Sequence, residues 1–174
     1  MQPVVRRTWA PRGQTPILVE NRNWDKLSVI GAITTQPGLY FEIIEGAFKG
    51  PRVLCFLVDL LTEITGDILL VWDNAAIHKT GEIKDFLARP DVAGRLEVMP
   101  LPSYAPKLNP EELINAHIKA QRLASFAPET AGELRKTAGK ELRRAACKSN
   151  LLTNILASSK HGLLDRKNLC QDNL

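Results

Sequence analysis

Three acidic residues occupy positions from which carboxylates could meet at one edge of a sheet. Asp73 directly follows the continuous apolar run 67–72 (DILLVW), which is typical of a buried strand in an α/β sheet. Glu111 and Glu112 begin a predicted helix after the next apolar strand, 96–101. Ligands of open α/β sheets collect outside the carboxyl ends of the strands, and carboxylate oxygens suit Mg²⁺ or Mn²⁺ rather than zinc. Such carboxylates could hold metal ions for phosphoryl transfer.

An ordinary structural role is open for each of these residues. An Asp followed by an Asn at the end of a strand often caps the next turn or helix, and position alone favours this role for Asp73. Acidic residues in the first turn of a helix complement the helix dipole. The dipole is a sufficient explanation for Glu111 and a weaker one for Glu112.

Two motifs carry a resemblance to a known family. Residues 72–80 read WDNAAIHKT and residues 99–119 read MPLPSYAPKLNPEELINAHIK. They resemble the IS630/Tc1/mariner superfamily of DDE transposases, whose members show D-N-x-x-x-H after one strand and L-P-x-Y-x-P-x-L-N-P-x-E after the next. The spacing of 38 residues between Asp73 and Glu112 lies within the family's range and selects Glu112 over Glu111 as the catalytic position. The matching positions are Asp73, Asn74, His78, Leu101, Pro102, Tyr104, Pro106, Leu108, Asn109, Pro110 and Glu112.

The sequence departs from the family's pattern at two motif positions and in one larger respect. Asn115 stands where relatives usually carry Trp, and Lys107 where an acidic or polar residue is frequent. The family's first catalytic Asp follows a strand upstream of the segment RTWAPRGQTP (7–16), and that strand would precede Met1. The earlier acidic residues do not replace it convincingly: Asp25, Asp59 and Glu63.

The resemblance implies a metal-dependent enzyme that hydrolyses DNA at transposon ends and joins the freed 3′-hydroxyl to target DNA, using two Mg²⁺ (or Mn²⁺) ions. Asp73 and Glu112 would be two of its three catalytic, metal-binding carboxylates. Asn74 and His78 could orient ligands or contact a DNA phosphate, and a turn-stabilising Asn and a structural His are equally open. Lys119 could contact phosphate as well, with a solvated Lys as the alternative.

The charge distribution is compatible with DNA as the partner. The formal net charge is +4 and the pI about 9.1, a balance that is also common among proteins that never bind nucleic acid. If the clustered cations contact phosphates, DNA binding should weaken steeply with salt; solvated surface is the alternative. The resemblance adds a homodimer, and an upstream transposase fragment supplying the first strand, as further partners. The two clusters are Arg6, Arg7 and Arg12 near the start, and Arg135, Lys136, Lys140, Arg143, Arg144 and Lys148 near the end.

Length and composition exclude several classes of protein. The 174 residues are 44% hydrophobic and favour one compact domain. The N-terminus lacks the features of a signal peptide and no apolar run reaches roughly eighteen residues, so we expect a cytoplasmic protein, associated with the nucleoid in a bacterium. Three distant cysteines without CxxC spacing indicate neither a disulfide framework nor a zinc site. The absence of a G-x-S-x-G elbow argues against a serine hydrolase.

Periodicity and chain breakers predict the elements that would position these residues. Strands at 26–34 and 39–45 form an antiparallel hairpin across Gln36-Pro37-Gly38. A helix follows at 52–64, with Gly66 as its stop. The strands 67–72 and 96–101, separated by a helix at 81–88, are predicted to pair in parallel, each buried on both faces.

The C-terminal third is predicted to be helical. Pro110 opens a helix that continues to about residue 122, and apolar residues at helical spacing follow beyond Pro128. Together with the resemblance, the pattern indicates an α/β fold: an RNase H-like mixed sheet lacking its first, central strand, with a helical C-terminal region. The expected parts are a partial catalytic core at 1–122, a helical extension of the same domain at 123–164 and a disordered tail at 165–174.

Two other functions compete with an active transposase. An RNase H-like nuclease without strand transfer would share the carboxylates. A catalytically inactive transposase remnant, acting at most as a DNA-binding or interaction module, fits the missing first Asp. Both active enzymes, the transposase and the nuclease, require Asp73 and Glu112 to lie close together. Their carboxylates should be within about 10 Å, the reach of a two-metal cluster.

We predict that the chain as it stands neither cleaves DNA nor folds as stably as its length suggests. The family's sheet order, 3-2-1-4-5, places the absent strand between the hairpin and the Asp73 strand. Unpaired buried backbone groups each cost on the order of 1–3 kcal/mol against a total stability of about 5–15 kcal/mol. Extending the chain upstream by the family's first strand and its Asp should raise the unfolding temperature and bring Mg²⁺-dependent nicking of transposon-end DNA. Equal unfolding temperatures and equal nicking would show that these 174 residues already supply what the strand provides.

Overall fold

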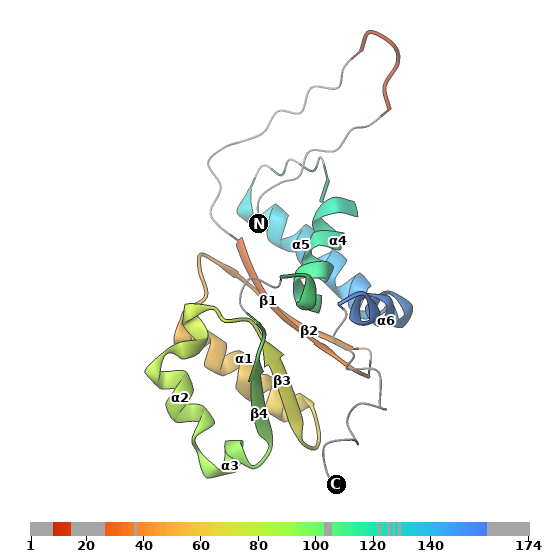
Figure 1. The fold of residues 1–174 in the computed structure, drawn as a ribbon. Helices are drawn as coiled ribbons and strands as arrows, with labels where there is room; N and C mark the ends of the chain where they lie inside the picture. The colour runs from red at the N-terminus through yellow and green to blue at the C-terminus, as the bar shows by residue number, and fades with distance from the viewer. Residues whose placement is uncertain are drawn as a thin grey trace. The chain divides into compact units, whose positions relative to one another are not determined.

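The structure is a computed structural model that describes residues 9–14, 27–36, 38–102, 106–121, 123, 124, 126, 128 and 130–159. The chain divides into two compact units (Figure 1). Unit 1 combines residues 1–47 with 110–174, and unit 2 is the continuous stretch 48–109. Within the described residues, no helix has the length and apolar character needed to cross a membrane.

Unit 1 is built on the predicted hairpin. Strands β1 (Leu27–Thr34) and β2 (Gly38–Glu45) pair antiparallel over their whole length, from Leu27 opposite Glu45 to Thr34 opposite Gly38. Their β-branched and aromatic side chains suit a pleated, half-buried surface. The predicted hairpin is therefore confirmed, although Lys26 and Pro37 lie outside the described residues.

Three helices complete unit 1: α4 (Pro110–Gln121), α5 (Ala131–Ala146) and α6 (Ser149–Ser158). Helix α5 begins at the N-cap residue Thr130, whose hydroxyl accepts the Glu133 N–H at 3.1 Å. Helices α4 and α5 pack against the hairpin (Figure 1). Apolar residues at helical spacing form one core with the hairpin, among them Leu27, Ile43, Ile114, Ile118, Leu134, Ala138, Leu142, Leu152 and Ile155.

Unit 2 contains the predicted parallel pair. Strands β3 (Ile68–Trp72) and β4 (Leu96–Pro100) run side by side in the register Ile68 to Leu96 and Trp72 to Pro100. Helix α2 (Gly81–Leu87) lies in the crossover between them. The same unit holds α1 (Gly50–Glu63), the short helix α3 (Pro90–Ala93) and the 3₁₀ turns η1 (Ala76–Lys79) and η2 (Pro106–Leu108).

The expectation that β3 and β4 are buried on both faces is wrong. Leu69 is 44% exposed and Met99 is 48% exposed, whereas Leu96 is 6% exposed. Successive side chains of a strand point to opposite faces, and Leu69 and Met99 share the face opposite to Leu96. The described residues form two separate two-stranded sheets, β1-β2 and β3-β4, and contain no strand that joins them.

The described cysteines take no part in the core or in a disulfide. Cys55 and Cys147 are exposed free thiols. Cys170 lies outside the described residues.

Arg95 fixes the end of α1 in unit 2. Its guanidinium donates to the carbonyl oxygens of Leu61 at 3.2 Å, Ile64 at 2.9 Å and Gly66 at 3.1 Å. These acceptors are the orphan carbonyls at and just beyond the helix end. Gly66 has φ 90°, a left-handed conformation that glycine adopts at little cost, so the predicted stop after the helix is confirmed.

We predict that Arg95→Lys lowers the unfolding free energy by about 1–3 kcal/mol, because a single ammonium cannot replace the planar fork that bonds three carbonyls. Urea unfolding of both proteins measures the difference. Arg89→Lys is the matched control, since exposed Arg89 forms its ion pair, within the described residues, with exposed Asp91 at 2.7 Å. Equal destabilisation by the two substitutions would contradict the assigned role of Arg95.

Candidate active site

Asp73 emerges from the carboxyl end of β3, where the sequence predicts a ligand. Its side chain is 50% exposed. One carboxylate oxygen, Oδ1, accepts the N–H of Ala75 at 3.0 Å and so caps the turn that follows the strand. Turn capping and ligand binding are therefore compatible, because the cap uses only one of the two oxygens.

His78 holds the same carboxylate oxygen. Its Nε2 lies 3.0 Å from Asp73 Oδ1, and its ring stacks on Trp72 with centroids 4.3 Å apart and planes 16° apart. Burial lowers the pKa of His78 below its ordinary value, an effect that outweighs the opposing charge and hydrogen bond of Asp73. The neutral imidazole donates from Nε2 to the carboxylate, while buried Nδ1 finds no partner among the described residues. His78 thereby fixes the orientation of Asp73.

Asn74 has a structural contact. Its amide Nδ2 donates to the carbonyl oxygen of Leu101, just beyond β4. The Leu101 N–H in turn donates to the carbonyl oxygen of Trp72 at 2.7 Å. Asn74 therefore ties together the carboxyl ends of the two parallel strands, which is the turn-stabilising role that the sequence left open.

Glu111 and Glu112 differ sharply in their surroundings on α4 in unit 1. Glu111 accepts a hydrogen bond from Asn115 Nδ2, and its Cγ lies so close to β1 that a Cβ added to Gly31 would meet it at 3.2 Å. Glu112 is exposed and makes no hydrogen bond or ion pair with the described residues. The unengaged carboxylate at the helix start is thus the one that the motif spacing selects.

The remaining predicted residues fall in different parts of the chain. Lys119 is half-buried on α4 and forms no ion pair within the described ranges. Arg12 is exposed in a turn closed by the Gln14 N–H and the Pro11 carbonyl at 3.0 Å. Arg6 and Arg7 lie outside the described residues, as does Tyr104 of the second motif.

The donor chemistry of the two carboxylates fits a hard divalent ion. Within the described part of the chain, Asp73 keeps Oδ2 available and Glu112 keeps both carboxylate oxygens available. Both are oxygen donors of the kind that Mg²⁺ and Mn²⁺ prefer. No group of three or more His, Cys, Asp or Glu side chains in the described part of the chain converges on a metal position. Asp73 belongs to unit 2 and Glu112 to unit 1, and their proximity stays a prediction.

Comparison with known proteins decides the family. The family model described as DDE superfamily endonuclease matches residues 1–135. The chain belongs to this family. No curated protein matches the sequence. The DDE carboxylates predicted from the motifs therefore lie in a domain of the expected superfamily, and whether the chain falls in the IS630 subgroup stays a prediction.

Solved structures show that the DDE chain has the RNase H-like fold of the mariner transposases. A Mos1 transposase paired-end complex with the left transposon end is similar over 95% of this chain, with a TM-score of 0.67 and 19% identity. A Mos1 mariner paired-end complex with Mn is similar over 97% of this chain, with a TM-score of 0.67 and 19% identity. The catalytic domain of Mos1 mariner transposase, solved alone, is similar over 82% of this chain and 77% of its own length, with a TM-score of 0.55 and 16% identity. The chain spans about half the length of the Mos1 chains in the first two complexes, at 49% and 50%.

Two contacts at these carboxylates are not evident from sequence. The stacking of Trp72 on His78 requires the 3₁₀ turn η1, which four residues are too few to signal by periodicity. The Asn115–Glu111 hydrogen bond has a weak local signal, because the two residues stand four apart on a predicted helix.

We predict that His78 makes the protein less stable in mild acid. Its folded pKa is lowered, so the unfolded chain binds the proton first, and this contribution to stability is lost as pH falls below about 6.5 towards the folded pKa. Urea unfolding between neutral pH and pH 5 should give a smaller pH dependence for His78→Gln than for the unsubstituted chain. His117→Gln, which changes another histidine, is the control. An unchanged pH dependence in His78→Gln would refute the buried, neutral state of this ring.

Proposed function

We propose that this chain is the larger part of the catalytic domain of an IS630/Tc1/mariner-type transposase, which cleaves DNA at transposon ends and joins the freed 3′-hydroxyl to target DNA. The observation that carries the proposal is the carboxyl end of β3, where His78 holds one oxygen of exposed Asp73 and leaves the other available. The DDE superfamily match supports it. So do the similar Mos1 structures, which are described as complexes with a transposon end and with Mn.

Asp73 and Glu112 would hold Mg²⁺ or Mn²⁺, with a third carboxylate supplied by an upstream segment. When bound, two such ions supply activation of the attacking water or 3′-hydroxyl and stabilisation of the leaving oxygen. His78 keeps Asp73 from rotating, through its Nε2–H and its stacking on Trp72. Outer partners of this kind commonly change metal affinity or activity by about 10–100-fold.

DNA would be the partner of the basic residues outside the carboxylate site. Arg12 is exposed and Lys119 is half-buried. Neither side chain has a hydrogen-bond or ion-pair partner among the described residues. Such side chains can position a DNA backbone without reading its sequence. Arg6 and Arg7 belong to the same proposal on sequence alone.

A catalytically inactive remnant is the second candidate function. It is favoured by one observation: the described residues hold no converging group of three acidic or histidine side chains. In this alternative the chain binds DNA or another protein without cutting. Nicking of DNA distinguishes the two functions.

The experiment compares Asp73→Asn, Glu112→Gln and Glu111→Gln, each in the chain extended by the family's first strand. We expect Asp73→Asn and Glu112→Gln to reduce Mn²⁺-dependent nicking of supercoiled DNA by at least roughly a hundredfold, the upper range for outer-shell partners of a ligand. Glu111→Gln should nick nearly normally, because its carboxylate is engaged with Asn115. Nicking that survives loss of Asp73 would exclude this site, and an extended chain that never nicks favours the remnant.

A further inference from the structure

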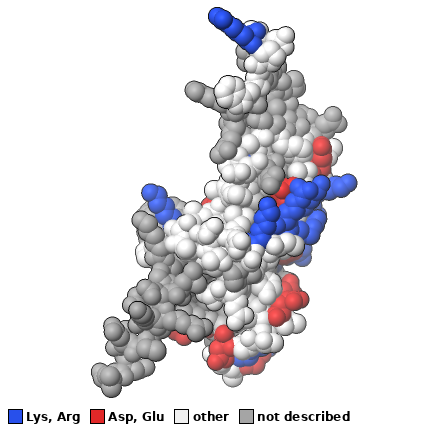
Figure 2. Space-filling view, turned by 90° about the vertical axis from the view of Figure 1, so that its right-hand side faces the viewer, with Lys and Arg blue, Asp and Glu red and all other residues white. Residues whose placement is uncertain are grey.

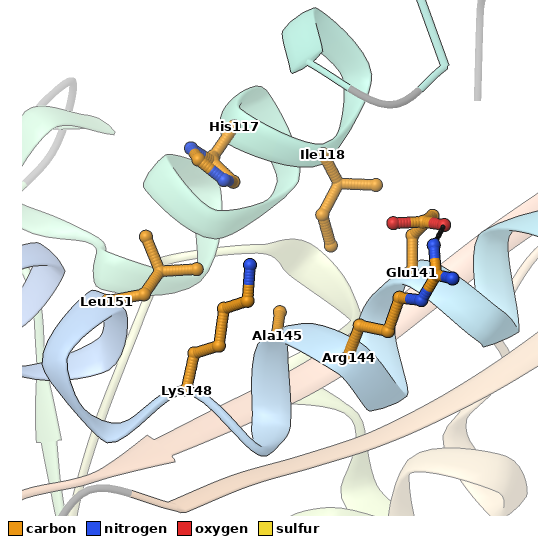
Figure 3. Close-up of a pocket in the computed structure, with 7 residues that line it drawn as sticks. All are labelled: His117, Ile118, Glu141, Arg144, Ala145, Lys148 and Leu151. Carbon is orange, nitrogen blue, oxygen red and sulfur yellow. Dashed lines mark hydrogen bonds and ion pairs between the residues drawn. The ribbon is translucent and has the colours of Figure 1, made fainter.

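A hollow in unit 1 lies among α4, α5 and α6, apart from the carboxylates discussed above (Figure 3). It has a volume of about 250 Å³ including its opening to solvent. Its apolar lining comes from Ile118, Ala145 and Leu151, one residue from each helix. Its polar lining is dominated by nitrogen donors, which determine the kind of ligand that it can take.

Three of these lining side chains carry nitrogen donors. Figure 3 shows Lys148 extending from the start of α6 toward α4, where His117 lies. Neither Lys148 nor His117 has a hydrogen-bond or ion-pair partner for its side chain within the described ranges. Arg144 donates from one terminal nitrogen to Glu141 Oε1 at 2.6 Å, which leaves its other N–H groups unused by that bond.

Among the described residues that line the hollow, Glu141 is the one acidic residue, and the charge of its carboxylate is compensated. The residue is 8% exposed and its carboxylate pairs with Arg144 on the next turn. With this pair neutral as a whole, Lys148 gives the lining a formal excess of one positive charge. The hollow therefore favours an anion over a cation.

The N-terminus of α6 adds to this preference. Lys148 is its N-cap residue and provides no side-chain cap for the first-turn N–H groups. Uncapped N–H groups at a helix start, together with the helix dipole, attract anions such as phosphate. Lys148 and Leu151 belong both to the start of this helix and to the wall of the hollow.

The hollow also terminates a row of cations on unit 1. Lys136, Lys140 and Arg144 follow one another at intervals of four residues on α5 and share one face, one helical turn apart, and Lys148 follows four residues later as the N-cap residue of α6. Figure 2 shows Lys and Arg side chains gathered on the face of unit 1 that carries α5 and α6. An extended polyanion is a better fit to such a row than an isolated ion.

We propose that this hollow seats one phosphodiester group of a DNA backbone, held by Lys148, Arg144 and the first-turn N–H groups of α6, with His117 as a further donor. The contact is independent of base sequence, because contacts to phosphate groups carry no direct sequence information. The inference rests on the proposed function only in taking DNA as the polyanion. It does not involve Asp73, Glu112 or a metal ion.

The test uses the full chain and a fluorescent 30-base-pair duplex of arbitrary sequence, with binding measured by anisotropy across salt concentrations. Lys148→Gln should weaken binding and reduce the slope of log affinity against log salt by about 1, the loss of one phosphate contact. Arg143→Gln is the matched control with the same change of charge. The Arg143 guanidinium lies over Gly139, within about 3.5 Å of where its Cβ would be, and does not line the hollow. Equal changes of slope in both variants would overturn the site.

A second measurement locates the contact and identifies the source of the phosphate. The amide resonances of Ser149, Asn150 and Leu151 should shift on addition of the duplex, and this shift should be lost in Lys148→Gln. If inorganic phosphate alone produces the shift and the duplex does not, the hollow is a free-anion site and the DNA proposal fails. If neither produces it, the row is solvated surface. DNA nicking by Asp73→Asn is measured in a separate experiment. Failure of the proposed transposase function can therefore be distinguished from failure of the phosphate site in the hollow.

Discussion

The candidate site depends on the joint between the carboxyl ends of β3 and β4. The two strands pair in parallel, and the last ladder bond runs from the Leu101 N–H to the carbonyl oxygen of Trp72. Asn74 then returns a side-chain hydrogen bond to the Leu101 carbonyl. The backbone N–H and the carbonyl oxygen of Leu101 are thus both bonded to residues that flank Asp73. These bonds fix the backbone of Asp73 at the end of the strand. His78 can fix the orientation of the Asp73 carboxylate only because the backbone of Asp73 is itself held in place.

The two glutamates at the start of α4 have different surroundings: Glu111 makes structural contacts, whereas Glu112, the predicted ligand, makes none with the described residues. Neighbouring residues on a helix point about 100° apart. Glu111 therefore packs against β1 near Gly31 and bonds Asn115, while Glu112 faces solvent. A carboxylate that serves a metal ion must not be saturated by protein donors. The family spacing predicts Glu112 as the ligand, and the packing of the helix leaves this side chain exposed.

Much of the fold could be predicted because its signals are local. The hairpin follows from β-branched runs on either side of Pro37-Gly38, and the parallel pair follows from a strand-helix-strand order whose crossover cannot be a short turn. The short helix α3 and the turn η2 were not predicted, since three or four residues show no periodicity. The exposure of Leu69 was not predicted either, because an apolar run does not show which elements of the fold cover each face of a strand. At the site, the family motif and its spacing predict Asp73 and Glu112 as ligands, whereas the stacking of His78 on Trp72 depends on the exact path of a turn.

Leu69 and Met99 also bear on how the protein behaves at high concentration. They leave an apolar strip on the β3-β4 sheet, and within the described residues β3 has a partner along one edge only. An open strand edge beside apolar side chains is a template on which strands of neighbouring molecules can pair. The formal charge of +4 opposes such encounters through repulsion that salt screens. Colloidal stability of this chain should therefore be greatest in dilute, low-salt solution, and precipitants such as ammonium sulfate should drive edge-to-edge association early.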